Sequence, residues 1–345
     1  MELAERIAYL KEYDGEQITI MEVCGSHTAS IAKNGIRTML SDKIRLVSGP
    51  GCPVCVTPSA YIDKLISLAL EEHVTIVSFG DLLRVPGSEK SLAQAKGEGA
   101  RVEMVYGPFD TLELAKKEPQ TQFVFAAVGF ETTTPVYALL AEQLLKENIK
   151  NVRLLTALKT MPPVLRYLCE NEAPVDAFLA PGHVCTVTGY RDYDDLAAEF
   201  QKPFGVAGFS AEEILEALYG IIKMKNIGKN RAYNFYPSVV TKEGNEKAKQ
   251  LIERYFEPAD AYWRGMGMIA GSGRRLKDAY QFLDAGSDGL TEDKKKNTGC
   301  SCDKVLLGKI EPRECPLFGK ICNPMHPQGA CMVSSEGACF SMMQE

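Results

Sequence analysis

A glycine-bearing turn follows an unbroken apolar run in the stretch Phe123-Val124-Phe125-Ala126-Ala127-Val128-Gly129-Phe130. An apolar run without strict alternation is typical of a strand that is covered on both faces, as in a parallel sheet. Similar runs recur along the first two-thirds of the chain, and most of them also lead into a glycine. We predict strands at Ile18–Val23, Ile44–Ser48, Thr75–Phe79, Val102–Tyr106, Phe123–Val128, Val152–Leu158, Ala177–Ala180 and Phe204–Gly208.

Helical patterns separate these strands, and such alternation indicates an α/β fold with crossover helices. A helix over Ala138–Glu147 divides the strands into two sets, so we predict two similar parallel-sheet, Rossmann-like domains. We place the first α/β domain at 1–120 and the second at 121–225. Residues 226–345 then form a connecting segment and a small cysteine-rich domain. Ligands of open α/β sheets lie beyond the carboxyl ends of the strands, so the polar turns there are the candidate sites.

Composition narrows the class of protein. The chain has 345 residues, of which 45% are hydrophobic and 24% charged, as in globular proteins. Its formal net charge of −6 argues against a nucleic-acid partner. No apolar run is long enough for a membrane span, and the N-terminal stretch lacks the features of a signal peptide. We therefore expect a cytoplasmic protein, in whose reducing surroundings clustered cysteines indicate metal or redox chemistry.

Six of the eleven cysteines lie near the C-terminus, at Cys300, Cys302, Cys315, Cys322, Cys331 and Cys339. This tail has too few periodic apolar residues for a core of its own, so a metal centre is expected to fix its shape. Four thiolates hold a 4Fe–4S cluster, which is the interpretation that we favour. Structural zinc is the main rival, although the tail lacks paired C-x-x-C knuckles, and free thiols are the third possibility. We select Cys315 and Cys322 as ligands, with either Cys300 or Cys302 and either Cys331 or Cys339.

A second motif, Cys52-Pro53-Val54-Cys55, follows a predicted strand and is expected to open a helix. A helix N-terminus lowers a thiol pKa, which suits a reversible dithiol–disulfide pair. The alternative is half of a zinc site, and the redox interpretation is favoured.

A third motif, Cys24-Gly25-Ser26-His27, also lies at a strand-to-helix turn. Cys24 and His27 are three residues apart and are able to share a helix face. A thiolate and an imidazole make a partial ligand shell for Fe(II). Packing and helix capping are the competing explanation for this pair.

Taken together, these segments resemble the HypD family of nickel–iron hydrogenase maturation proteins. The resemblance runs in order through Met21–Thr28, Ser48–Pro58, Phe79–Ser88, Val128–Pro135, Pro181–Gly189, Trp263–Gly273 and Cys300–Phe340. Two small departures are Ser26, where the family usually has Thr, and Ser301, where Arg is common. Neither replaces a thiol.

The resemblance implies a metallocentre assembly scaffold with redox activity rather than a conventional enzyme. In the family, Fe(II) with cyanide and carbon monoxide ligands is held between this protein and a HypC-type chaperone, and a HypE-type protein donates the cyanide. By position, Cys24 would hold the iron with His27 beside it, Cys52 and Cys55 would be the redox pair, and the tail would carry the 4Fe–4S cluster. We expect the cluster and the dithiol to supply electrons near Cys24.

Two other functions remain open at this point. A cluster-dependent thiol–disulfide oxidoreductase would use the C-x-x-C motif on a protein substrate and would not need Cys24. A zinc-stabilised binding module would need only the tail cysteines.

Overall fold

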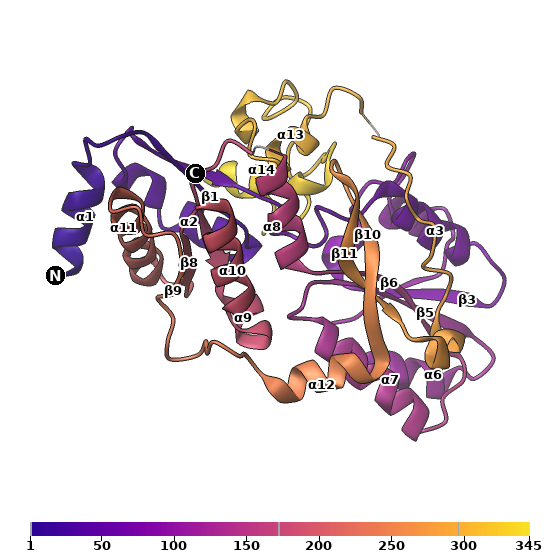
Figure 1. The fold of residues 1–345 in the computed structure, drawn as a ribbon. Helices are drawn as coiled ribbons and strands as arrows, with labels where there is room; N and C mark the ends of the chain where they lie inside the picture. Colours follow the sequence, from indigo (N-terminus) through magenta and orange to yellow (C-terminus); the bar gives the residue numbers. More distant parts are fainter. Residues whose placement is uncertain (1, 172, 296) are drawn as a thin grey trace.

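The computed structural model describes residues 2–171, 173–295 and 297–345 and contains two β-sheets (Figure 1). The first sheet has the order β2-β1-β7-β8-β9, and all its strands are parallel. Its strands are β1 (Ile18–Glu22), β2 (Ile44–Ser48), β7 (Ala177–Pro181), β8 (Phe204–Ala207) and β9 (Ala232–Asn234). The predicted α/β fold is therefore confirmed for this sheet.

The second sheet has the order β10-β11-β6-β5-β3-β4. Strands β3 to β6 are parallel, and an antiparallel hairpin of β10 and β11 extends the edge beside β6. The strands are β3 (Val74–Ser78), β4 (Val102–Met104), β5 (Gln122–Gly129), β6 (Val152–Lys159), β10 (Phe256–Trp263) and β11 (Gly267–Leu276). All eight predicted strands are present, with boundaries within one or two residues of those expected.

This hairpin was not predicted, because residues 226–345 were expected to form only a connecting segment and a cysteine-rich domain. Its strands lack an apolar run: burial along β10 alternates irregularly, and the pairing register shifts between Ala259 and Ala261. Gly265, in the turn between the two strands, and Gly267, the first residue of β11, both have positive φ. These two glycines therefore permit a tight hairpin turn.

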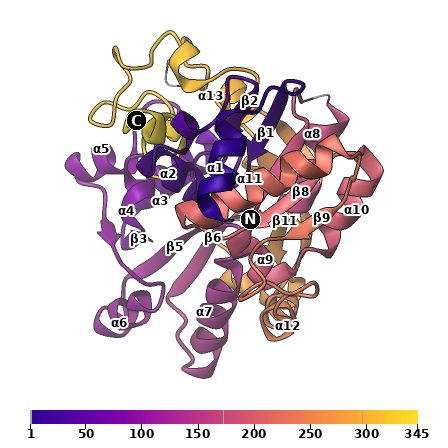
Figure 2. The same ribbon diagram turned by 90° about the vertical axis from the view of Figure 1, so that its left-hand side faces the viewer.

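The helices cover the faces of both sheets (Figures 1 and 2). Those of the first two-thirds are α1 (Leu3–Lys11), α2 (Gly25–Lys33), η1 (Ile36–Met39), α3 (Ser59–Ala69), α4 (Gly80–Leu83), α5 (Leu92–Gly97), α6 (Asp110–Lys117), α7 (Thr134–Lys146), α8 (Met161–Glu170), α9 (Gly182–Thr188), α10 (Arg191–Phe200) and α11 (Ala211–Asn226). Those that follow are α12 (Glu246–Tyr255), η2 (Asp278–Leu283), α13 (Cys302–Leu306), η3 (Pro312–Glu314), η4 (Ala330–Met332) and α14 (Ala338–Met342).

The chain passes between the two sheets more than once. It leaves the first sheet after β2, builds β3 to β6 in the second, returns for β7 to β9 and ends with β10 and β11 in the second. Helix α7, which we expected to separate two sets of strands, instead connects β5 and β6, which are neighbours in one sheet. The sheets therefore do not follow the boundaries placed at 120 and 225, and the division into domains stays a prediction.

Aromatic side chains pack closely against the first sheet. Across β7 and β8, Phe178 is in register with Phe204, and the two fully buried rings stack at 4.7 Å between centroids. Buried aromatic pairs of this kind stabilise a sheet beyond the area that they bury.

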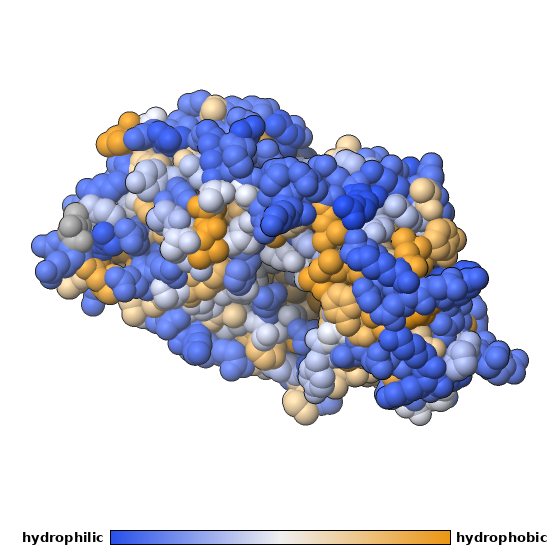
Figure 3. Space-filling model, turned by 90° about the horizontal axis from the view of Figure 1, so that it is seen from below, coloured by the Kyte–Doolittle hydropathy of each residue, from blue (hydrophilic) through white to orange (hydrophobic). Residues whose placement is uncertain are grey.

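The C-terminal tail consists of loops and short helices and is drawn in yellow at the top of Figure 1. It contains no strand within residues 297–345, yet all six of its cysteines are buried. Figure 3 shows a largely hydrophilic surface from below, hollowed near its middle. No helix in the described part of the chain combines the length and the apolar character that a bilayer-spanning helix needs.

Candidate functional site

Cys24 lies where β1 gives way to α2, as the sequence predicted. Its backbone is still extended, and it is the N-cap residue of the helix. The Cys24 N–H donates a hydrogen bond of 3.2 Å to Oε2 of Glu22, a fully buried carboxyl group. The Thr28 hydroxyl donates to Oε1 of the same carboxyl at 2.6 Å. Glu22 thus fixes both ends of the turn that presents the Cys24 thiol.

The Cys24 thiol is 8% exposed, and its burial raises its pKa to about 12. The backbone N–H groups of His27 and Ser26 act against this shift, whereas the charge of Glu336 adds to it. Burial also raises the pKa of Glu22 to about 7. Cys24 is therefore a neutral thiol at pH 7, and a metal ion that binds its sulfur must displace the proton.

His27 is fully buried, and burial lowers its pKa to about 4. Its Nε2 lies 2.8 Å from the Gly208 carbonyl oxygen, so the neutral ring carries its hydrogen on Nε2. Nδ1 has no hydrogen-bond partner among the described residues. The ring stacks on Phe209 at 4.7 Å, and His183 stacks on Phe209 at 3.8 Å. His27 thus joins α2 to the turn after β8, with a lone pair on Nδ1.

Gly51 brings the C-x-x-C loop against Cys24. The Gly51 carbonyl accepts a 2.9 Å hydrogen bond from the Gly25 N–H. A Cβ atom at position 51 would lie 2.3 Å from the Cys24 nitrogen and 2.7 Å from its Cα. Only glycine permits such a close approach of two backbones. The C-x-x-C motif and the Cys24 motif are therefore in direct contact.

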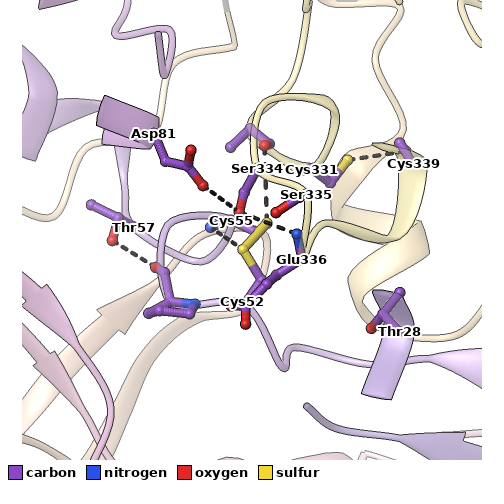
Figure 4. The surroundings of a disulfide bond; sticks show 12 residues. Thr28, Cys52, Cys55, Thr57, Asp81, Cys331, Ser334, Ser335, Glu336 and Cys339 are labelled. Atoms are coloured by element: carbon purple, nitrogen blue, oxygen red, sulfur yellow. Dashed lines mark hydrogen bonds between the residues drawn. A yellow bond between two sulfur atoms is a disulfide. The ribbon is translucent and has the colours of Figure 1, made fainter. Parts of the chain in front are cut away.

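Cys52 and Cys55 form a disulfide and are both buried (Figure 4). The expectation that this pair opens a helix is wrong, because the two residues lie in a turn of their own and α3 begins at Ser59. Pro58 is the N-cap of α3. It has no N–H for an intrahelical bond, and it disfavours a helical conformation at Thr57. The helix therefore starts only after the proline.

The tail closes over this disulfide. Cys55 Sγ lies 3.9 Å from the carbonyl oxygen of Ala330, the residue before Cys331. The Ser334 hydroxyl donates to Asp81 at 2.8 Å, and the Ser26 hydroxyl donates to Glu336 at 2.8 Å (Figure 4 shows the first). A cavity of about 560 Å³ opens beside Cys52 and Glu336. Cys24, the disulfide and the tail thus form one continuous set of contacts.

The tail cysteines are close to one another. Cys331 Sγ lies 3.1 Å from Cys339 Sγ, and a Cβ on Gly329 would lie 2.7 Å from Cys300 Sγ. Hydrogen bonding with Cys302 and burial raise the pKa of Cys300, and burial raises that of Cys322. Cys322 Sγ also accepts a 3.4 Å hydrogen bond from the Gln328 N–H. Buried thiols near backbone N–H groups fit the donor set of an iron–sulfur cluster.

No group of three or more His, Cys, Asp or Glu side chains within residues 2–171, 173–295 and 297–345 is arranged to hold a single metal ion. The cluster and its ligands among the six tail cysteines therefore stay a prediction.

Two residues of this region were not singled out from the sequence. Glu336 lies against Gly25, where a Cβ would come within 2.4 Å of the glutamate Cβ, and its charge acts on Cys24. Arg264 donates from Nε to the Thr57 carbonyl at 2.7 Å, just after the C-x-x-C turn. Both contacts join segments hundreds of residues apart, so no local pattern indicates them.

A second buried carboxyl group lies between the sheets. Glu131, in the turn after β5, accepts a 2.8 Å hydrogen bond from the Met161 N–H at Oε1. Its Oε2 has no partner among the described residues, and it borders a cavity of about 270 Å³ that Arg274 also lines. Burial raises the pKa of Glu131 to about 7.

These features define a two-sheet α/β protein in which a buried thiol, a disulfide and a cysteine-rich tail meet at one end. The family model described as "HypD: Hydrogenase formation hypA family" matches residues 1–345, and the chain belongs to this family.

The chain is also similar in sequence to several curated proteins over nearly its whole length. The chain is 42% identical to a putative hydrogenase expression/formation protein of Methanocaldococcus jannaschii, over 98% of this chain and 92% of the relative. It is 40% identical to the hydrogenase maturation factor HypD of Escherichia coli, over 99% and 93% of the two chains. It is 39% identical to the protein of the same name from Rhodobacter capsulatus, over 99% and 92%.

Proposed function

We propose that this protein is a cytoplasmic hydrogenase maturation factor on which the iron centre of a nickel–iron hydrogenase is assembled with its cyanide and carbon monoxide ligands. The names of its relatives support the general role. The observation that carries the specific role is the continuous contact from Cys24 through Gly51 and the Cys52–Cys55 disulfide to Ala330 in the tail.

Cys24 is the residue that we assign to iron. A thiolate is a suitable soft ligand for Fe(II), and the helix N-terminus provides backbone N–H groups that favour the thiolate. Because the pKa of Cys24 is about 12, the incoming iron replaces a proton that must leave the site. Glu22, whose pKa is about 7, is hydrogen-bonded to the same turn and is able to accept a proton near neutral pH. The neutral His27 holds the helix in place.

Cys52 and Cys55 form the redox pair in this proposal. Reduction of the disulfide takes up two electrons and two protons and yields two thiols. Both sulfurs are nearly inaccessible to solvent, which limits exchange with small thiols of the cytoplasm.

The tail would hold a 4Fe–4S cluster through Cys315, Cys322, one of Cys300 and Cys302, and one of Cys331 and Cys339. Such a cluster supplies one-electron transfer when it is bound. The chain's own contribution is to bury the thiols and to offer a backbone N–H donor, that of Gln328, to Cys322 Sγ.

Partners belong to the same proposal. A HypC-type chaperone would share the iron, and a HypE-type protein would donate the cyanide groups. The cavity of about 560 Å³ beside Cys52 supports an approach from this side, because Tyr106 at its rim is 90% exposed and Met104 is 47% exposed. Exposed aromatic and methionine side chains are common at protein interfaces.

The test replaces Cys24 by alanine in the full chain, produced anaerobically with its maturation partners. We expect the infrared bands of iron-bound cyanide and carbon monoxide to disappear while iron and sulfide remain bound to the tail. Cys169→Ala is the matched control, since Cys169 is a half-buried cysteine outside the site. Normal cyanide bands in the Cys24→Ala protein would overturn the assignment.

A thiol–disulfide oxidoreductase is the second candidate, and it is favoured by one observation. Cys52 is only 4% exposed but lines the cavity of about 560 Å³, so the disulfide lies close to the surface there. Such an enzyme would keep its full disulfide-exchange rate in Cys24→Ala and would lose it in Cys52→Ala. A maturation scaffold would lose the cyanide bands in both variants.

A further inference from the structure

Arg264 lies at the joint between the C-x-x-C loop and the cysteine tail. It follows β10 directly, at the tip of the β10–β11 hairpin. Its backbone N–H donates to the Val56 carbonyl at 2.9 Å, and its Nε donates to the Thr57 carbonyl at 2.7 Å. The hairpin tip is therefore fastened to the turn immediately after Cys55.

The same tip also contacts the start of the tail. Gly265 has a φ of +77°, and a Cβ at this position would lie 2.6 Å from Cβ and 2.8 Å from Cα of Asp303. Asp303 is the neighbour of Cys302 in the first turn of α13. Arg264 is thus placed within a few residues of both groups of cysteines.

The guanidinium group of Arg264 is buried but only partly satisfied. Arg264 is 7% exposed, and its Nη2 has no hydrogen-bond partner among the described residues. The Asp293 carboxylate pairs with the guanidinium at Nε, from which its Oδ1 lies 3.6 Å. A guanidinium keeps its charge and its N–H donors in any protein, and a buried donor without an acceptor is costly. An acceptor is therefore expected next to Nη2.

We propose that Nη2 of Arg264 donates a hydrogen bond to a sulfur of the tail's iron–sulfur cluster and that its charge raises the cluster's reduction potential. This inference rests on the cluster assigned under the proposed function. A reduced cluster carries one more negative charge than an oxidised one, so a nearby cation stabilises the reduced state. Hydrogen bonds to the sulfurs and local net charge are established determinants of cluster potential. Arg264 is a positioning residue, which also holds the C-x-x-C loop beside the tail.

The experiment compares four anaerobically purified full-length proteins: wild type, Arg264→Met, Arg264→Lys and Asp293→Asn. Iron and sulfide are counted first, and the midpoint potential is then measured by spectroscopic redox titration. We expect a lower potential in Arg264→Met, because the cation and the donor are both lost. Arg264→Lys keeps the charge but loses the planar donor group, so its midpoint potential should lie between those of the wild type and of Arg264→Met. Asp293→Asn removes the opposing carboxylate and should raise the potential.

Lys294→Ala is the matched control. This lysine side chain is 69% exposed and pairs with Glu292, so its charge is screened by solvent and its loss should leave the potential unchanged. Loss of the buried cation in Arg264→Met leaves Asp293 unpaired and risks misfolding. If that variant fails to fold, the opposite shifts in Arg264→Lys and Asp293→Asn decide the question.

The outcomes separate the two proposals. A wild-type protein without iron and sulfide would overturn the cluster itself and, with it, the role of Arg264. Fully loaded Arg264→Lys and Asp293→Asn proteins with the wild-type potential would overturn only the role of Arg264, and Nη2 would then be bonded to a buried water.

Discussion

Cys24 and the six tail cysteines have opposite structural settings. Cys24 follows a strand that is in register with β2 on one side and β7 on the other, so the sheet fixes its backbone. The tail cysteines lie in loops and in helices of at most five residues, which are too short to be stable alone. The first site is therefore organised by the polypeptide itself. We expect the second site to need a ligand that stabilises its arrangement.

The largest expected effect follows from removing one of the proposed cluster ligands. In Cys322→Ala we expect loss of bound iron and sulfide, because one of the four thiolates is missing. Amide hydrogens of residues 300–345 should then exchange rapidly, whereas those of β1 and β5 remain protected. Hydrogen-exchange mass spectrometry measures both regions in one experiment.

The Cys169→Ala protein serves as the control and should match wild type in iron content and exchange. If the amide hydrogens of residues 300–345 stayed protected from exchange after complete loss of iron, the expected contrast between the two regions would be wrong.

The next effect concerns pH and the α/β part of the molecule. Burial raises the pKa of Glu131 from 4.5 to about 7, so the folded protein binds this proton more tightly than the unfolded chain. The stabilising contribution is complete below pH 4.5 and is lost as the pH rises through 7, by up to about 3 kcal/mol. Glu131→Gln keeps an acceptor for the Met161 N–H and removes this titration.

Urea unfolding at several pH values tests this prediction. The Glu131→Gln protein should gain stability relative to wild type as the pH increases from 5 to 8. An identical pH profile for both proteins would show that Glu131 ionises normally in the folded state.

The smallest effect concerns the contact that joins the two regions. In Gly51→Ala, the added methyl group meets the backbone of Cys24, which has to move. Overpacking of this kind costs about 1–3 kcal/mol. Gly97→Ala is the control, since a Cβ at Gly97 meets nothing within 4 Å. Chemical denaturation should show a loss of stability only at position 51, and equal stabilities would mean that the two loops separate easily.

The sequence was sufficient for the elements that depend on local pattern. The eight apolar runs form strands, and Cys24 lies at a strand-to-helix turn, as predicted. Burial on both faces of a strand and the cap of a helix each depend on residues that are neighbours in the sequence, so a local pattern indicates them. Helix α3 begins later than predicted, because Pro58 is its N-cap and disfavours a helical conformation at Thr57.

Sheet membership could not be predicted, because it depends on pairs such as Ile20 with Ala177, which lie far apart in the chain. The same holds for the candidate site. The cysteines could be selected as candidate site residues, but the contact of Gly51 with Cys24 and that of Arg264 with Thr57 exist only in the folded chain. The hairpin escaped detection because irregular strands with glycines lack a period-two pattern.

The repeated passage of the chain between the sheets has a consequence for synthesis on the ribosome. Strand β1 emerges early, but its partner β7 begins only at Ala177. Until then one edge of β1 is an unpaired template for other chains. We expect nascent chains that end before β7 to associate with chaperones, and this dependence to disappear once β7 and β8 have emerged.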